Sequence, residues 1–251
     1  MQHALMVALW MAVTSTTAFW LWRSKLVAHI KGIPISFIFM VLAILTVLCK
    51  SANGWFMLVL GCGGYFAYQL VPRLRPFRLL LILIPVYCLL RITGVLEAAT
   101  VESFASQLLD AERVDSLVIR LVQEDLFVAK TLEQPLLGWG GYERGWPIDP
   151  QTGRKAVQMI DALRLIAFNT RGALGLAALL ATMMVGPWMV LRGPSVRIGF
   201  LESTSLVTVL LSLVVLMFMV DTLFNGMINT MFILTSGALC TYGSTVASEK
   251  R

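Results

Sequence analysis

Charged residues are scarce in this chain of 251 residues, of which only 14% are Asp, Glu, Lys or Arg. Soluble domains carry about 25% charged and about 45–50% apolar residues. Here 58% of the residues are apolar and the mean hydropathy is +0.80. These proportions exclude a soluble enzyme, and they exclude a disordered chain, which has too little apolar surface to fold. The composition therefore favours a helical membrane protein.

Histidine and cysteine are also rare, which limits the chemistry available. The two histidines, His3 and His29, have no metal-ligand residues beside them. The four cysteines lie inside apolar runs and form no CxxC pair, so they predict neither a metal centre nor a disulfide framework. No Ser/His/Asp or Cys/His catalytic set can be assembled from these residues. We therefore expect a protein that uses neither a metal nor another cofactor.

Long apolar runs recur along the chain. Seven runs have the length, about 17–25 residues, that crosses a hydrocarbon core about 30 Å thick as a helix. They occupy residues 4–22, 32–49, 54–70, 79–96, 172–191, 203–220 and 229–246. The sequence therefore predicts an all-α, polytopic membrane protein with about seven transmembrane helices.

Basic residues near these runs fall on alternate connections, in groups of three, three, two and two. The groups are Arg23, Lys25 and Lys31; Arg73, Arg75 and Arg78; Arg192 and Arg197; Lys250 and Arg251. Such residues mark the cytoplasmic side of a membrane protein. We therefore expect an outer N-terminus, a cytoplasmic C-terminus, and membrane regions 1–96 and 172–251 separated by an extracytoplasmic loop, 97–171. Orientation among membrane lipids explains the basic charge, so nucleic acid is not an expected partner.

The loop 97–171 is too long for a simple connection, since most connections have about 4–6 residues. Its residues 103–133 predict an amphipathic helix that ends before Pro135, with Arg120 and Glu124 on one polar face. These two residues are candidate site residues, or only a surface ion pair worth about 0.3–0.5 kcal/mol. A second short helix, at about 157–170, carries Asp161 and Arg164, which have the spacing of a helical ion pair.

Glycine, aromatic side chains and one arginine gather between these two expected helices. The residues are Gly138, Trp139, Gly140, Tyr142, Arg144 and Trp146. The aromatic rings are of the kind that stacks on sugars, and equally of the kind that anchors at a membrane interface. The segment lacks the GxxxxGK[ST] pattern of a phosphate loop and follows no predicted strand, so nucleotide binding is disfavoured.

Arg91 lies inside the fourth apolar run, about one helical turn from its outer end. A charge within a membrane is costly and usually faces a cavity or a partner, which makes Arg91 a candidate site residue. In the alternative interpretation, its long side chain only extends to the outer membrane interface.

Four segments, taken in order, resemble the superfamily of O-antigen ligases and O-antigen polymerases, which includes exopolysaccharide polymerases. Residues 48–54 are similar to the start of a glycine-bearing span in that family, and residues 116–124 are similar to its arginine helix. Residues 135–140 (PLLGWG) look like its PxxGxG signature. Asp161, eleven residues before Gly172, stands where the ligases carry a histidine. The resemblance covers about residues 40–180.

The resemblance implies a metal-independent membrane glycosyltransferase of the GT-C type in the bacterial inner membrane. Such enzymes transfer a glycan from undecaprenyl diphosphate, on the periplasmic side, to a lipid or glycan acceptor. Arg120 matches the diphosphate-binding arginine, and Arg91 and Arg144 are further candidates because arginine binds such anions through paired hydrogen bonds. Asp161 is then the candidate base for the acceptor hydroxyl, and Glu124 is the second candidate catalytic carboxylate.

Two features depart from the family pattern. The loop 97–171 has no histidine, which favours the polymerase or exopolysaccharide branch over a lipid A-core ligase. Family members have more than seven spans, so we expect this chain to lack N-terminal helices, as a partial gene product or as a shortened relative. The alternative functions are a transporter or flippase for lipid-linked saccharides, and a truncated, inactive relative.

Overall fold

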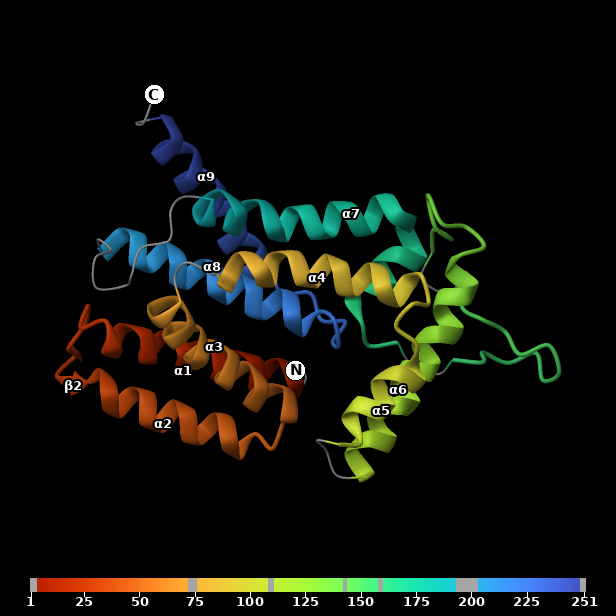
Figure 1. The fold of residues 1–251 in the computed structure, drawn as a ribbon, viewed down its shortest axis with the longest axis horizontal. Coiled ribbons are helices and arrows are strands. Elements are labelled where there is room, and N and C mark those ends of the chain that lie inside the picture. Colours follow the sequence, from red (N-terminus) through yellow and green to blue (C-terminus); the bar gives the residue numbers. More distant parts are fainter. Residues whose placement is uncertain are drawn as a thin grey trace. The chain divides into compact units, whose positions relative to one another are not determined.

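The computed structural model describes residues 4–71, 76–107, 111–141, 144–157, 160–192 and 203–248, and most of these residues are helical. The prediction of a mostly helical chain is confirmed, and each of the seven apolar runs contains a helix (Figure 1). In chain order the elements are α1 (Ala4–Arg23), β1 (His29–Ile30), β2 (Ile33–Pro34), α2 (Ile35–Leu48), α3 (Ala52–Leu70), α4 (Pro76–Ile92), α5 (Ala98–Ala105), α6 (Ala111–Thr131), α7 (Leu163–Leu191), α8 (Ser203–Asp221) and α9 (Thr230–Ser248).

Two helices within the described residues, Leu5–Arg23 and Leu163–Leu191, are long and apolar enough to cross a membrane. Three further apolar helices, Ile35–Leu48, Ser205–Asp221 and Thr230–Thr241, are shorter. The helix α2 is short because its expected first residues form a hairpin, in which Ile30 pairs with Ile33. The polytopic topology with seven spans stays a prediction.

The chain forms two compact units. The first comprises Met1–Ile82, Thr182–Asp221 and Asn229–Arg251, and the second comprises Leu83–Ala181 and Thr222–Ile228. The helices α4 and α7 each contribute residues to both units. The division at residues 96 and 171 that the sequence suggested stays a prediction.

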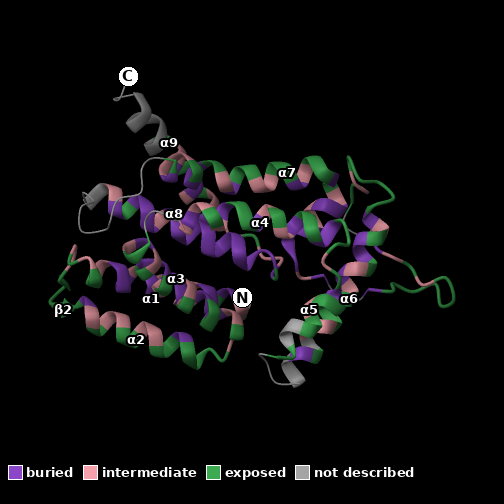
Figure 2. Ribbon diagram, in the orientation of Figure 1, coloured by how far each residue is buried: buried purple, intermediate pink, exposed green. Residues whose placement is uncertain are grey.

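In the first unit, α1 packs against α2, α3 and α8. The Trp20 indole N–H donates to the Gly61 carbonyl at 3.0 Å, and a Cβ at Gly61 would lie 2.0 Å from Thr16 Oγ1, so only glycine permits this approach. Figure 2 shows α8 largely buried, whereas α2 has many exposed and half-exposed residues. The exposed side chains of α2 include Phe37 and Ile44, at 52% and 59% exposure. The outer surface of α2 is therefore apolar.

The second unit contains the candidate site, and two of its helices differ from those expected from the sequence. The expected helix 103–133 is divided into α5 and α6, and α6 ends at Thr131. The expected helix 157–170 begins only at Leu163, because residues 157 and 160–162 are not helical. The Leu163 N–H donates to the carbonyl of Thr222 at 3.2 Å, a tertiary contact that helps to fix where α7 begins.

Candidate functional site

The helix α6 carries two of the predicted site residues, and it places them in different environments. Leu121, Phe127 and Val128 are buried on one side of the helix, and Glu124 lies among them with 8% exposure. Arg120, one turn earlier, is exposed. The polar face expected from the sequence is therefore divided into a buried carboxylate and an exposed cation.

Glu124 lies between two buried arginines. Its Oε2 accepts hydrogen bonds from Arg91 Nη2 at 3.3 Å and from Arg164 Nη2 at 2.7 Å, and both arginines are 2% exposed. Arg91 also lies 2.9 Å from Asp125 Oδ1 and donates to the Leu96 carbonyl at 2.6 Å. Burying an unpaired charged group lowers the free energy of unfolding by roughly several kcal/mol per ion. The buried charges of this ion cluster, Arg91–Glu124–Arg164, therefore depend on one another.

Two ion pairs expected from helical spacing do not form among the described residues. Arg120 does not pair with Glu124, and Asp161 does not pair with Arg164. The reason is that two arginines distant in the sequence bind the Glu124 carboxylate, Arg91 from 33 residues away and Arg164 from 40 residues away. The Arg91 guanidinium is buried in the cluster, which favours its interpretation as a site residue over that of a side chain extending to the membrane interface.

Arg164 belongs to the site although the sequence suggested only a helical ion pair for it. Its guanidinium lies over the ring of Tyr87, with its carbon 5.3 Å from the ring centroid. Its Nε and Nη1 atoms are buried and have no hydrogen-bond partner among the described residues. A signal was available, because Arg164 is a single cation within an apolar stretch, the same pattern that singled out Arg91.

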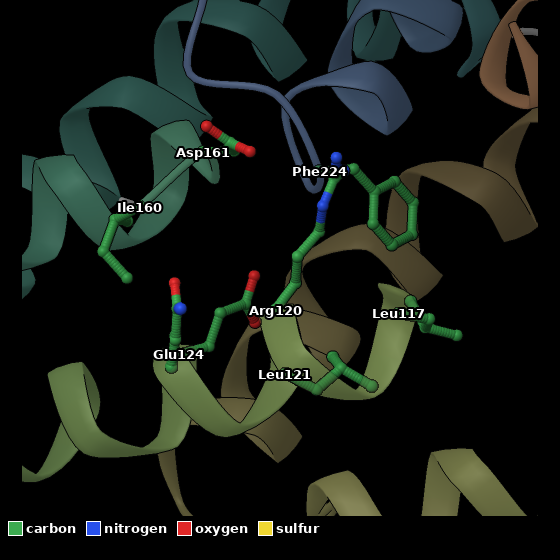
Figure 3. A pocket seen from close by; sticks show the side chains of 8 residues that line it. Leu117, Arg120, Leu121, Glu124, Ile160, Asp161 and Phe224 are labelled. Atoms are coloured by element: carbon green, nitrogen blue, oxygen red, sulfur yellow. The ribbon is translucent and has the colours of Figure 1, made fainter. Parts of the chain in front are cut away.

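A cavity of about 170 Å³ lies beside the ion cluster. Arg120 and Glu124 line it from α6, and Asp161 and Phe224 line it from elsewhere in the same unit. Figure 3 shows Arg120 extending from α6 beside Phe224, with Asp161 across the opening. Arg120 forms no ion pair with any described residue. The structure therefore brings three predicted site residues together around one cavity, and Arg91 adjoins them through Glu124.

The helix α7 is broken at Gly172, whose φ of 64° and ψ of −162° are not helical. The break frees backbone groups on both sides, and residues 135–140 supply their partners. The hydrogen bonds are Trp139 N–H to Asn169 O (2.8 Å), Gly140 N–H to Thr170 O (3.0 Å), Ala173 N–H to Pro135 O (2.7 Å) and Leu174 N–H to Leu136 O (3.4 Å). Because unpaired buried backbone groups are costly, this docked segment, residues 135–140, replaces the interrupted helical hydrogen bonds.

Two glycines permit the close approach of the docked segment to α7. A Cβ at Gly138 would lie 2.5 Å from the Gly172 nitrogen, and a Cβ at Gly172 would lie 2.2 Å from the Leu136 oxygen. Gly138 also has a φ of +69°, which favours glycine. Gly140 has a φ of +80°, but a Cβ there would meet nothing within 4 Å. The PxxGxG-like sequence thus has a clear structural role in this chain.

The two tryptophans of this region contribute mainly to packing. Trp146 is 6% exposed and packs edge-on against Phe127, with ring centroids 5.6 Å apart. Trp139 is half-buried, and its indole N–H donates to the Lys130 carbonyl at 3.1 Å. The Lys130 ammonium lies 4.2 Å from the centre of the Trp139 ring. Trp139 therefore joins the docked segment to the end of α6.

Arg144 is exposed, and its backbone N–H donates to the Gly141 carbonyl at 3.1 Å in a turn. It does not line the cavity beside Arg120. Tyr142 lies outside the described residues. Of the three arginines suggested for diphosphate binding, the structure places Arg120 at the cavity and Arg91 in the adjoining ion cluster, but it places Arg144 elsewhere.

An exposed turn at residues 149–154 holds another carboxylate. Asp149 accepts hydrogen bonds from the Thr152 hydroxyl at 2.7 Å and from the Gln151 N–H at 2.9 Å. These hydrogen bonds, that of Thr152 above all, lower the pKa of Asp149 below its ordinary value. The Asp149 carboxylate is therefore occupied within its own turn, unlike Asp161 at the cavity.

Comparisons with protein-family models, with curated proteins and with solved structures give no match for this chain. Within the described ranges, no three or more His, Cys, Asp or Glu side chains are placed together to hold a metal ion. The cavity and the ion cluster, together with the residues that carry the family resemblance, are therefore the features that point to a function.

Proposed function

We propose that the chain is a polytopic protein of the bacterial inner membrane that transfers or polymerises glycan from an undecaprenyl diphosphate carrier, in O-antigen or exopolysaccharide biosynthesis. The observation that carries the proposal is that Arg120 and Asp161 line one cavity next to a buried ion cluster. Such a transfer requires a cation to bind the leaving diphosphate and a carboxylate to act as base. Arg120 and Asp161 are available for these roles, because neither forms an ion pair with a described residue. The resemblance of residues 40–180 to the ligase and polymerase superfamily supports the same activity.

In the proposed reaction the acceptor hydroxyl oxygen attacks the anomeric carbon of the donor sugar. The bond from this carbon to the diphosphate oxygen breaks, and the diphosphate leaves with the electron pair. Asp161 takes the hydroxyl proton, and Arg120 stabilises the leaving diphosphate through two parallel N–H donors. The cavity is small beside the ~300–1,000 Å³ of sites for drug-sized ligands, so it accommodates only the reacting groups.

Glu124 is assigned a positioning role in place of the catalytic role that the sequence suggested. Its Oε2 already accepts hydrogen bonds from Arg91 and Arg164, at 3.3 Å and 2.7 Å. This oxygen is therefore engaged by two arginines, whereas the Asp161 carboxylate is half-buried and forms no ion pair with any described residue. The buried, unpaired N–H groups of Arg164 favour an anionic ligand near the cluster.

The apolar surface of the chain supports the membrane location. Contiguous exposed apolar surface is uncommon on soluble proteins, and α2 exposes Phe37, Ile44 and Leu48, the last at 64%. Two helices of the described part of the chain are long and apolar enough to cross a membrane. Of the ten basic residues behind the expected orientation, five lie outside the described residues, namely Arg73, Arg75, Arg197, Lys250 and Arg251.

The orientation is tested with reporter fusions. A reporter at Gly153 is expected to be extracytoplasmic, and one at Arg75 is expected to be cytoplasmic, because basic connections stay inside. The opposite result at both positions would overturn the orientation and place the cavity on the cytoplasmic side.

The activity is tested in cells that lack the protein. A polymerase predicts accumulation of single lipid-linked repeat units on the periplasmic side, and a ligase predicts polymer that is not attached to lipid. Accumulation on the cytoplasmic side would instead indicate the transporter or flippase. Normal glycans in these cells would overturn the proposal and indicate an inactive relative. Transfer in isolated membranes is expected to continue in EDTA, because the proposed mechanism uses no metal.

A further inference from the structure

Two adjacent leucines in the docked segment are strongly exposed. Leu136 and Leu137 are 70% and 72% exposed, and they follow Pro135, which is also exposed. Exposing two large apolar side chains side by side to water is unfavourable, at about 25 cal/mol for each Å² of apolar surface. The proposed mechanism does not use either leucine, so their exposure needs another explanation.

The exposure of these leucines is a fixed feature of the fold. The Leu136 carbonyl accepts a hydrogen bond from the Leu174 N–H, and Pro135, Trp139 and Gly140 make the other backbone hydrogen bonds of the docked segment. A segment held at both ends by the backbone of α7 cannot turn its side chains inward without losing these bonds. The leucines therefore form a rigid apolar projection.

The projection is continuous with the apolar surface of α7. Leu174, whose N–H is 3.4 Å from the Leu136 oxygen, is itself 63% exposed. It lies just after the break at Gly172, within a helix that is long and apolar enough to cross a membrane. Leu136, Leu137 and Leu174 therefore form one exposed patch, which we call the leucine patch.

Residues next to the leucine patch are of the kind found at a membrane interface. Trp139 follows Leu137 by two residues, is half-buried, and has its indole N–H bonded to a backbone carbonyl. Lys130 places its ammonium 4.2 Å from the centre of this ring. Tryptophan and lysine are enriched where a membrane protein meets the lipid headgroups.

We propose that Leu136 and Leu137 insert into the acyl chains at the outer surface of the bilayer and anchor the docked segment there. The proposal rests on the proposed membrane location, and it gives the PxxGxG-like sequence a lipid-binding role in addition to its packing against α7. The occupant is the phospholipid bilayer itself, because the leucine patch continues onto the apolar face of α7.

Photo-crosslinking tests this proposal in the full chain. Benzoylphenylalanine replaces Leu136, Leu137, Leu174 or Thr152, one at a time, and the protein is reconstituted in vesicles of phosphatidylethanolamine and phosphatidylglycerol. Leu174 serves as the reference for a membrane-facing position on α7. Thr152, in an exposed turn of the same loop, serves as the matched control for water. All four side chains are at the surface or nearly so, so the substitutions are expected to leave the fold intact.

After irradiation, positions 136, 137 and 174 are expected to give phospholipid adducts several-fold more abundant than position 152, measured by mass spectrometry. A lipid adduct at position 174 but none at 136 and 137 would overturn the inference and leave the membrane location standing. Protein adducts at positions 136 and 137 would overturn it in favour of a protein partner. The absence of lipid adducts at all of these positions would overturn the membrane location as well.

Discussion

Arg120 and Glu124 are neighbours on successive turns of α6, yet Arg120 is exposed and forms no ion pair with a described residue, whereas Glu124 is buried between two arginines. Both residues line the same cavity, but only Glu124 has its charge compensated by buried partners. Helical spacing identifies neighbours on an isolated helix, whereas partners distant in the sequence decide which of these neighbours has a structural role. The compensated group holds the fold together, and the uncompensated group is available to a ligand.

The largest expected effect comes from removing the charge of Glu124. Glu124→Gln leaves two buried guanidinium groups, Arg91 and Arg164, without their shared carboxylate, and breaking such a buried pair costs about 3–5 kcal/mol. We expect a large fall in the thermal unfolding temperature in detergent and a fall in membrane abundance. Glu133→Gln is the matched control, because Glu133 is exposed and, among the described residues, pairs with Lys130 alone, an interaction worth under about 1 kcal/mol. Equal effects of the two substitutions would contradict the structural role of Glu124.

Arg120→Lys is expected to spare stability and to remove activity. Lysine keeps the charge but lacks the planar fork that binds a diphosphate through two hydrogen bonds. We expect glycan transfer to fall about 10²-fold or more, the scale for removing one transition-state donor, with unchanged unfolding temperature. Arg154→Lys, in the exposed turn of the same loop, is the control and should transfer normally. Near-normal transfer by Arg120→Lys at equal abundance would remove Arg120 from the site.

Two alanine substitutions in the docked segment are expected to loosen its packing on α7, which carries Arg164 of the ion cluster. Gly138→Ala adds a Cβ against the Gly172 backbone at a positive φ, and we expect a loss of about 2–3 kcal/mol in the free energy of unfolding. Gly140→Ala has the positive φ but open space around it, so we expect a loss of only about 1 kcal/mol. Unfolding curves of the two variants, measured side by side, check this order. The reverse order would mean that the docked segment does not pack closely on α7.

The smallest expected effect concerns Asp149, a carboxylate that its own turn already satisfies. Thr152→Ala removes the hydroxyl that donates to Asp149 at 2.7 Å, so the pKa of Asp149 should rise toward its ordinary value. It should not rise fully, because the Gln151 N–H still donates to the carboxylate. The lowered pKa of Asp149 favours the folded turn above the unfolded pKa, and this contribution is lost as the pH falls through the folded pKa. The variant should therefore be slightly less stable than wild type at neutral pH and no different from it in strong acid. Carboxyl NMR titration of aspartate-labelled protein measures the shift, and an unchanged titration would contradict this assignment.

The sequence predicted the positions of the apolar helices well, because their signal is local. The run at residues 4–22 and the helix Ala4–Arg23 nearly coincide, and the run that begins at residue 172 starts at the break in α7. It did not predict that Arg164 would bind Glu124, because a partner 40 residues away leaves no periodic pattern. It also assigned Trp146 to sugar or membrane contact, although the ring packs in the core. The reason is that a glycine-rich segment with aromatic residues has the same composition whether its rings are buried or exposed.

In the proposed membrane location, the break at Gly172 also determines how much of α7 is available as a membrane span. Its 29 residues would measure about 44 Å as one straight helix, much more than a hydrocarbon core of about 30 Å. After the break only about 20 residues continue to Leu191, or about 30 Å, and the polar Arg164, Asn169 and Arg171 all precede it. In a bilayer, a longer helix would have to tilt or stretch the lipids to relieve hydrophobic mismatch. The position of a single glycine then sets the bilayer thickness to which this helix is matched.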